Sequence, residues 1–407
     1  MIRSVKLSTK FINKDKENKY HSIFTEYLNI VKQFIDILWN RKNIPSLLPK
    51  EITSKIDNTW LTQRAIQSAG KLASSIVRGT RQKQKQRLYI LKQLQKEGTQ
   101  TKKIINLQRK INQANISKPN INDIHPELDS RFIKIDVNNP TSFDIWITLS
   151  SIGNKLKIPI PLKRTRVFNK WNELGKLKPT VRLYKNKIEV IFDIPNEINK
   201  TDGRILGLDI GIKNTYTTSD NQTSLPDNHG HTLESIIQKL SRKKKGSKGF
   251  ERAQQHRKNY INWSINQLNL SKVKQINIED IKYLRYKSRY SRALSHWTYT
   301  DIFDKLGRYC EEQNVSVLTI NPRYTSQRCS VCGWTQKKNR KGKVFCCVKC
   351  GNTCDSDLNA SCNLSFALPE ISREDCLNYS NVSGFYWNKN GLSSECIVPN
   401  VQKVENI

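Results

Sequence analysis

The spacing of apolar residues divides the first half of the chain into two kinds of segment. Residues 1–11 alternate between apolar and polar side chains, which predicts a short strand, and residues 21–39 show apolar residues at helical spacing. From about 59 to 114, an apolar face is followed by cation after cation with few helix breakers, which predicts long basic helices. A polar, proline-containing linker over 118–128 ends this segment.

Short β-branched runs follow between about 130 and 195, separated by Asn, Gly and Lys turns, and they predict a small β-domain. The first strand is expected to join this β-domain, so that the helical segment is an insertion. From 205 to 320, strands and helices alternate as in an α/β layer. The predicted fold class is therefore multidomain α+β.

Composition points to a polyanionic partner. The 407 residues suffice for two to four domains, and they carry 70 Lys and Arg against 35 Asp and Glu, a formal charge of +35. Such a surplus opposes compaction unless a polyanion offsets it, and nucleic acid phosphates do so with release of counterions. An AT-rich genome would inflate Lys, Asn and Ile, but it would not explain the shortage of acids. Nucleic acid is therefore the expected partner.

The chain contains no apolar run long enough to span a bilayer, and its first residues lack the apolar core of a signal peptide. We therefore expect a cytoplasmic protein without a membrane partner. In a reducing compartment, Cys-x-x-Cys pairs more often indicate metal than disulfide.

Three acids follow apolar runs in separate parts of the chain. Asp209 closes ILGLD, Glu279 closes KVKQINIE, and Asp357 lies near the start of a predicted helix in CDSDLNASCNL. A buried strand that ends in one acid delivers that acid to the sheet edge. Such carboxylates could converge on Mg²⁺, and two ions could serve phosphodiester hydrolysis. Taken singly, each acid is as readily a turn residue, a strand-end charge or a helix cap, and Asp355 is a rival to Asp357.

Two Cys-x-x-Cys-Gly knuckles are separated by fourteen residues. Four thiolates in tetrahedral array would bind a structural zinc ion and leave no open position for chemistry. The expected ligands are Cys329, Cys332, Cys347 and Cys350. Cys346 or Cys354 could replace one ligand of the second pair. The other cysteines, interpreted as packing or free thiols, are Cys310, Cys362, Cys376 and Cys396.

Residues 241–260 hold eight Lys or Arg and one Glu. A charge run is often only a solvated face, but this one is a candidate for phosphate contact. The candidate residues are Lys243, Lys244, Lys245, Lys248 and Arg257. Arg328, in TSQRC beside the expected active site, could hold the scissile phosphate. Aromatic residues such as Trp60, Trp297 and Tyr299 could stack on bases, although core packing is the more usual role.

The order of these motifs resembles one family. GLDIGIKNTYTTSD, INIEDI, NPRYTSQRCSVCGW, FCCVKCG and DSDLNAS resemble the split RuvC-like nuclease of the TnpB proteins, transposon-encoded RNA-guided DNA nucleases related to the compact type V CRISPR effectors. The match covers about 204–366, and the first half matches only in layout. The resemblance implies an RNase H-like fold and carries the catalytic positions onto Asp209, Glu279 and Asp357, with Ser361 standing where the family usually has Ala.

The resemblance also implies a domain order. The expected domains are a first strand of a wedge β-domain (1–20), a helical recognition domain (21–129), a wedge β-barrel (130–200), a RuvC-like nuclease (201–325) with a basic bridging segment (240–268), a zinc ribbon (326–353), and the end of the nuclease with a loosely ordered tail (354–407).

The function implied is RNA-guided cleavage of double-stranded DNA beside a short flanking motif, with two Mg²⁺ ions, a structural Zn²⁺ ion and a structured guide RNA. One protein copy on the RNA is favoured, although the oligomeric state stays open. Two alternatives remain: an RNA-guided repressor without cleavage, which the retained acids argue against, and an unguided structure-selective nuclease. Whether the guide derives from a transposon end or a CRISPR array is also open.

Overall fold

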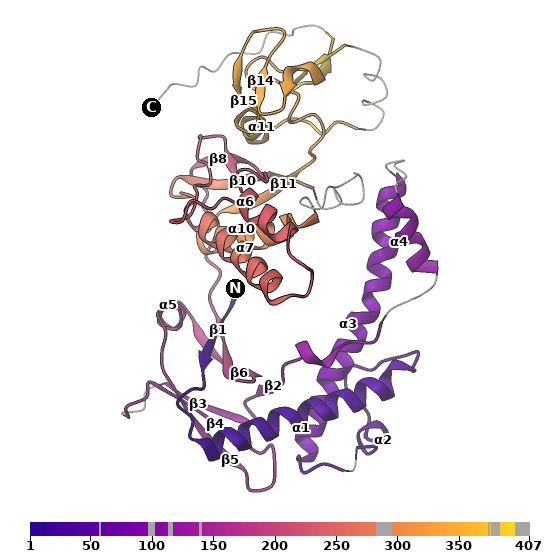
Figure 1. Cartoon of the computed structure of the whole chain (residues 1–407), viewed down its shortest axis with the longest axis vertical. Helices are drawn as coiled ribbons and strands as arrows, with labels where there is room; N and C mark the ends of the chain where they lie inside the picture. The colour runs from indigo at the N-terminus through magenta and orange to yellow at the C-terminus, as the bar shows by residue number, and fades with distance from the viewer. Residues whose placement is uncertain are drawn as a thin grey trace. The chain divides into compact units, whose positions relative to one another are not determined.

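The computed structural model describes residues 1–56, 58–96, 102–112, 117–137, 141–281, 295–372, 375 and 383–394. The chain forms two compact units, Met1–Asn196 and Glu197–Ile407 (Figure 1). Cys376 and Cys396 lie outside the described residues, as do parts of the tail. No helix in the described ranges is long and apolar enough to cross a membrane.

The helices of the first unit confirm the predicted helical segment. They are α1 (Lys14–Trp39), the short α2 (Lys50–Thr53), α3 (Gln63–Lys96) and α4 (Lys102–Asn112). Asn13 starts α1 by accepting a hydrogen bond from the backbone N–H of Lys16. The first half of α3 buries Ala65, Ala69 and Ala73. Small residues at helical spacing allow close approach, and α1 packs along α3 at this point.

Two antiparallel sheets complete the first unit, and most of their strands lie within the segment that was predicted to be rich in strands. One has the order β1-β7-β6-β2, built from β1 (Ile2–Ser8), β7 (Lys187–Asp193), β6 (Lys176–Tyr184) and β2 (Glu127–Asp129). The first strand of the chain therefore pairs with a strand that follows the helices. The other sheet joins β3 (Ile133–Asp136), β4 (Ile145–Ser150) and β5 (Lys157–Leu162). Two short elements, η1 (Ile121–Asp123) and α5 (Arg166–Leu174), were not predicted.

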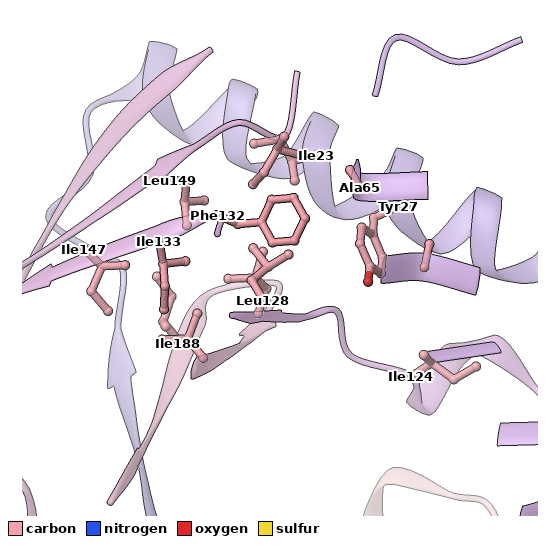
Figure 2. Close-up of a cluster of buried hydrophobic side chains, with 14 of the residues drawn as sticks. Ile23, Tyr27, Ala65, Ile124, Leu128, Phe132, Ile133, Ile147, Leu149 and Ile188 are labelled. Carbon is pink, nitrogen blue, oxygen red and sulfur yellow. The ribbon is translucent and has the colours of Figure 1, made fainter. Parts of the chain in front are cut away.

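One core joins the helices and the sheets of the first unit. Figure 2 shows Ile23 and Tyr27 of α1 beside Phe132 and Leu128, with Ile188 of β7 below them. All five side chains are fully buried. The helical insertion and the β-domain are therefore held together by shared burial of apolar surface.

The second unit contains a sheet of order β11-β10-β8-β9. Its strands are β8 (Arg204–Asp209), β9 (Thr217–Thr218), β10 (Val273–Glu279) and β11 (Ser316–Ile320), and β8, β10 and β11 run parallel. Leu206, Leu208, Ile276 and Ile278 share a core with residues of three helices. These helices are α6 (Leu233–Ser241), α7 (Lys248–Asn266) and α10 (Tyr299–Glu312).

Helix α11 (Ser356–Ser365) packs against the same sheet through the residues between those core positions. A Cβ at Gly207 would lie only 1.8 Å from the carbonyl oxygen of Ser361, so the backbones of β8 and α11 are in direct contact. The neighbouring strand β10 supplies Asn277, whose side-chain amide donates to the Leu364 carbonyl oxygen at 2.8 Å. Helices therefore cover both faces of the sheet, and α11 is fixed to the central strands.

The ribbon is made of short pieces. They are β12 (Trp334–Thr335), η2 (Lys337–Asn339), β13 (Arg340–Lys341), β14 (Val344–Cys346) and β15 (Thr353–Asp355), followed by β16 (Phe385–Asn388) and β17 (Gly391–Ser393). The last two belong to the tail, and β16 pairs with β12. The expectation of a loosely ordered tail is therefore wrong for residues 383–394, because Trp387 donates its backbone N–H to Gly333 and its indole to Pro369.

Candidate active site and metal centres

The three acids singled out in the sequence line one cavity in the second unit. Asp209 and Glu279 end the neighbouring parallel strands β8 and β10, whose carboxyl ends meet at the same sheet edge. Asp357 reaches the cavity from the first turn of α11. The cavity measures about 400 Å³. Its other lining residues are Ile210, Gly211, Ile212, Lys213, Trp297, Pro322, Ser326, Arg340 and Lys343.

Asp355 and Asp357 have different roles in the structure. The Asp355 carboxylate caps α11 by accepting hydrogen bonds from the backbone N–H groups of Asp357 at 2.8 Å and Leu358 at 3.2 Å. Asp357 itself is 4% exposed and lines the cavity. Ser361, the departure from the family pattern, is accommodated because its hydroxyl donates to the Leu358 carbonyl oxygen. Asp355 therefore has a structural role at the helix start.

Burial and repulsion between neighbouring carboxylates destabilise the charged forms of Asp209 and Glu279. Burial raises the pKa of Asp209 well above its usual value, and the negative charges of Glu279 and Asp357 raise it further. Burial also raises the pKa of Glu279, while a hydrogen bond from Thr325 and the charge of Arg340 lower it. A divalent cation would relieve this repulsion, and carboxylate oxygens are the ligands that Mg²⁺ prefers. The three acids therefore place carboxylate ligands suited to a divalent cation around one cavity.

Two cations in the cavity were not predicted from the sequence. Lys343 forms an ion pair with Oδ2 of Asp357, and the Arg340 guanidinium lies 3.6 Å from Oδ1. Both come from the β13–β14 hairpin of the ribbon. The only signal in the sequence is the basic turn KKNRKGK between the two knuckles, which is typical of a solvated loop.

A hydrogen-bond network holds Glu279 in place. The Thr325 hydroxyl lies 2.5 Å from Oε1 of Glu279, and the threonine side chain is buried. The Asn363 amide of α11 donates to the Thr325 carbonyl oxygen at 2.8 Å. Thr325 thus links the strand that carries Glu279 to the helix that carries Asp357.

The four predicted zinc ligands come together in the ribbon. Their sulfur atoms all lie within 4.8 Å of one another, the residues being Cys329, Cys332, Cys347 and Cys350. The residue after each knuckle has a positive φ, +79° at Gly333 and +72° at Gly351, a conformation that favours glycine. The hydrogen bond between Cys329 and Cys332 lowers the pKa of the Cys329 thiol and raises that of Cys332, because the two sulfurs lie close enough to share a proton. These four thiols fit a closed structural zinc site.

The alternative cysteines lie outside this cluster. Cys346 is exposed on β14, and its sulfur contacts the Thr353 hydroxyl at 3.5 Å. Cys354 pairs with Phe345 across the β14–β15 ladder and packs against the ribbon core. The geometry therefore favours Cys347 over Cys346 as the third ligand.

The ribbon is tied to the beginning of α11. The backbone N–H of Ser356 donates to the Lys343 carbonyl oxygen at 2.9 Å. On the other side, the Asn359 amide donates to the Arg328 carbonyl oxygen at 2.7 Å and accepts from the backbone N–H of Ser330. Order in the ribbon therefore fixes the turn of helix that carries Asp357.

The predicted phosphate-contacting residues fall into two groups. Exposed side chains in and after the turn between α6 and α7 belong to Lys243, Lys244, Lys245 and Lys248. Arg257 is instead buried, donating to the His296 carbonyl oxygen and lying 3.8 Å from Asp301. A nucleic acid strand cannot reach it in this structure, which corrects the expectation for Arg257.

Arg328 is corrected in the same way. Its side chain is 6% exposed, and its guanidinium donates to the Trp387 carbonyl oxygen at 2.7 Å and to the Asn363 side chain at 2.6 Å. Burial lowers the pKa of this group to about 10. Arg328 therefore supports the ribbon, while Arg340 and Lys343 occupy the place near the acids that was assigned to it.

A family model matches part of the second unit. Residues 299–364 match the family model of the Cas12f1-like TNB domain. The CRISPR-associated endodeoxyribonuclease Cas12f1 of Sulfoacidibacillus thermotolerans is 40% identical over 99 residues, covering 24% of this chain and 22% of that protein. The Cas12f1 of an uncultured archaeon is 23% identical over 225 residues, covering 46% of this chain and 42% of that protein. The matched part is thus less than half the length of these relatives.

A solved structure shows a similar fold over most of the chain. The mini-RNA-guided endonuclease CRISPR-Cas_phi3 aligns with a TM-score of 0.50 and 11% identity, covering 91% of this chain and 93% of that chain. The predicted resemblance is therefore confirmed: this chain is similar to the compact type V CRISPR effectors and TnpB-like nucleases.

Proposed function

We propose that this protein is an RNA-guided DNA endonuclease, a hydrolase that cuts target DNA with two Mg²⁺ ions held by Asp209, Glu279 and Asp357. One observation carries the proposal: three acids from two strands and a distant helix line a single cavity. A buried acidic cluster of this kind is unfavourable for folding without a cation and is typical of a functional site. The relatives named as endodeoxyribonucleases support the same reaction.

The chain's own residues supply position and charge. Bound Mg²⁺ would activate water on one side of the phosphodiester and stabilise the leaving oxygen on the other. Thr325 orients Glu279, and α11 holds Asp357 at the end of β8. Arg340 and Lys343 bring positive charge to the edge of the cavity, where a phosphate would enter. The zinc ion would act at a distance from the reaction, by fixing the hairpin that carries these two cations.

The remaining parts of the proposal concern domains and partners. The second unit would contain the RNase H-like nuclease (201–325 and the chain after 354) with the ribbon (326–353), and the first unit would contain the wedge and recognition domains. A guide RNA would supply sequence specificity by pairing, and the protein would contact a short flanking motif in double-stranded DNA. Four exposed lysines would contact phosphates along the 240–268 segment: Lys243, Lys244, Lys245 and Lys248. The complex would be cytoplasmic, with one protein copy favoured.

The test is a cleavage assay with the copurified RNA. Target DNA should be cut only with Mg²⁺ and a matching guide, and Asp209→Ala should abolish cutting while DNA binding persists. Full cutting by Asp209→Ala with the same RNA would show that the site assignment is wrong. Guide-dependent binding without any product would indicate a repressor, and cutting that survives RNase treatment during purification would indicate an unguided nuclease.

A further inference from the structure

Three aromatic side chains gather on the solvent side of the β3-β4-β5 sheet in the first unit. On β4, Ile145, Ile147 and Leu149 point into the core, so the alternate residue Trp146 lies on the outer face. The ring of Phe143 lies 5.8 Å from that of Trp146, and the ring of Phe11 lies 5.4 Å from that of Phe143, measured between centroids. We call Phe11, Phe143 and Trp146 the aromatic platform.

The platform is partly open to solvent and separate from the core of its unit. Phe11 is 37% exposed, and Phe143 and Trp146 are half-buried. Among the described residues, the core of the first unit is formed by other side chains. The Trp146 indole N–H donates to the Thr141 hydroxyl at 2.8 Å, so the polar edge of this ring is already satisfied. The aromatic platform would therefore contact a ligand through the faces of its rings rather than through a hydrogen bond.

Lysines surround the platform. The Nζ atom of Lys10 lies 4.8 Å from the Phe11 ring centroid, and that of Lys163 lies 5.6 Å from the Phe143 ring centroid. On the outer face of the same sheet, Lys134 and Lys157 are also exposed. Two carboxylates also lie nearby: Asp144 accepts the backbone N–H of Arg164, and Asp136 lies directly opposite Trp146 on β3. Exposed rings bordered by cations are complementary to a strand that carries bases and phosphates together.

We propose that the aromatic platform stacks an unpaired base of the guide RNA, with Lys10 and Lys163 holding the adjacent phosphates. The identity of the strand rests on the proposed function. A guide presents unpaired loops and ends before any target duplex is opened, and unpaired RNA bases are the ones that stack on protein aromatics. Trp146 is held by its position in β4, and Phe143 and Phe11 are held by contacts between the rings. The platform is therefore formed in the absence of RNA.

Photocrosslinking to the full-length, RNA-free chain tests this directly. The probe is a single-stranded oligouridine with one 5-iodouridine, and the crosslinked peptide is located by mass spectrometry. Crosslinks should fall on Trp146, Phe143 or Phe11. Because mapping uses the unsubstituted chain, it does not depend on a variant that folds. A deoxy oligomer of the same sequence runs in parallel, and a crosslink to the deoxy oligomer alone would overturn the assignment to RNA.

Affinity for the oligouridine supplies the second measurement. Trp146→Leu should weaken binding about 5- to 100-fold, the range for losing one base–aromatic stack, and Trp146→Phe should restore most of it. Trp60→Leu is the matched control, since Trp60 is 44% exposed in the same unit but packs at Gly153, in the β4–β5 turn at the other end of the hairpin from Trp146. Raised salt screens the many other cations, so the difference between variants should persist there.

The outcomes distinguish this inference from the proposed function. If Trp146→Leu binds like Trp60→Leu and the crosslinks fall elsewhere, the platform is not a base-stacking site, whether or not the protein cuts DNA. If crosslinks map to Trp146 but no guided cleavage is found, the platform stands and the endonuclease proposal fails.

Discussion

Replacing Gly207 with Ala should disable the proposed nuclease activity, although Gly207 lies outside the lining of the acidic cavity. Gly207 lies in β8, two residues before Asp209, and α11 crosses directly over it. An added Cβ would lie 1.8 Å from the carbonyl oxygen of Ser361 and 2.6 Å from the backbone N of Ser365. Both neighbours are backbone atoms of a helix, so rotation of a side chain cannot relieve the clash.

The size of the effect follows from these distances. Ordinary contact of a Cβ begins near 3.4 Å, so α11 must withdraw by about 1.6 Å. Overpacking of this kind costs about 1–3 kcal/mol of the free energy of unfolding. The same movement displaces Asp357, and misplacement by about 1 Å costs on the order of 100-fold in rate. We therefore expect cleavage to fall about 100-fold or more, a larger effect than the loss of stability.

Two measurements on the guide-loaded protein check this expectation. Cleavage rates are compared at saturating Mg²⁺, and thermal unfolding should show a midpoint lowered by about 2–10 °C. Gly307→Ala is the matched control, because a Cβ at Gly307 in α10 would meet open space. That substitution should leave cleavage unchanged and stabilise the helix by up to about 1 kcal/mol.

The reasoning would be refuted if Gly207→Ala cut DNA at the rate of the Gly307→Ala control. The contact between β8 and α11 would then not control the position of Asp357. If Gly207→Ala has the same melting temperature as the control but does not cut DNA, the predicted loss of stability from the clash with α11 would be wrong, while the effect on cleavage would remain.

Three further predictions concern the neighbours of the cavity. Thr325→Val should raise the pKa of Glu279 further, because it removes the hydroxyl that favours the charged form of that acid. The acid limb of the pH–rate profile should therefore move to higher pH, whereas Thr325→Ser should leave it in place. Cys347→Ser should lower the zinc content measured by mass spectrometry and abolish cleavage, while Cys346→Ser should change neither. Asp355→Ala should cost about 1 kcal/mol of unfolding free energy in thermal melts, from loss of the helix cap, and should leave cleavage measurable in the gel assay.

The three acids could be predicted because each depends on local pattern. A buried strand that ends in a carboxylate has a defined direction, and parallel neighbours bring Asp209 and Glu279 to the same edge. The residues alone left Asp355 as a rival; the resemblance to the TnpB motif favoured Asp357, and the capping role of Asp355 agrees with that choice. The zinc ligands were predictable for the same reason, since both knuckles are local turns with glycine at a fixed place.

The cations could not be predicted, because their roles depend on partners far away in the chain. The sequence predicted that Arg257 and Arg328 are exposed, because they lie in basic or polar segments. In the structure, Arg257 instead donates to the His296 carbonyl oxygen and Arg328 to the Trp387 carbonyl oxygen, and both side chains are buried. A basic turn that looked solvated delivers Lys343 to Asp357. Charge along a sequence shows how many cations a segment has, but burial and ion pairing depend on tertiary contacts.

The zinc ribbon and the acidic cavity are connected through helix α11, which carries Asp357. The hairpin that carries Lys343 also accepts a backbone hydrogen bond from Ser356, the first residue of α11. The opposite side of the ribbon holds Asn359, one turn further along the same helix. Since α11 begins between these two attachments, loss of zinc would release both the helix start and the cation that offsets its carboxylate. In the proposed nuclease, zinc would therefore be as necessary for cleavage as the acids, although it would take no part in the reaction.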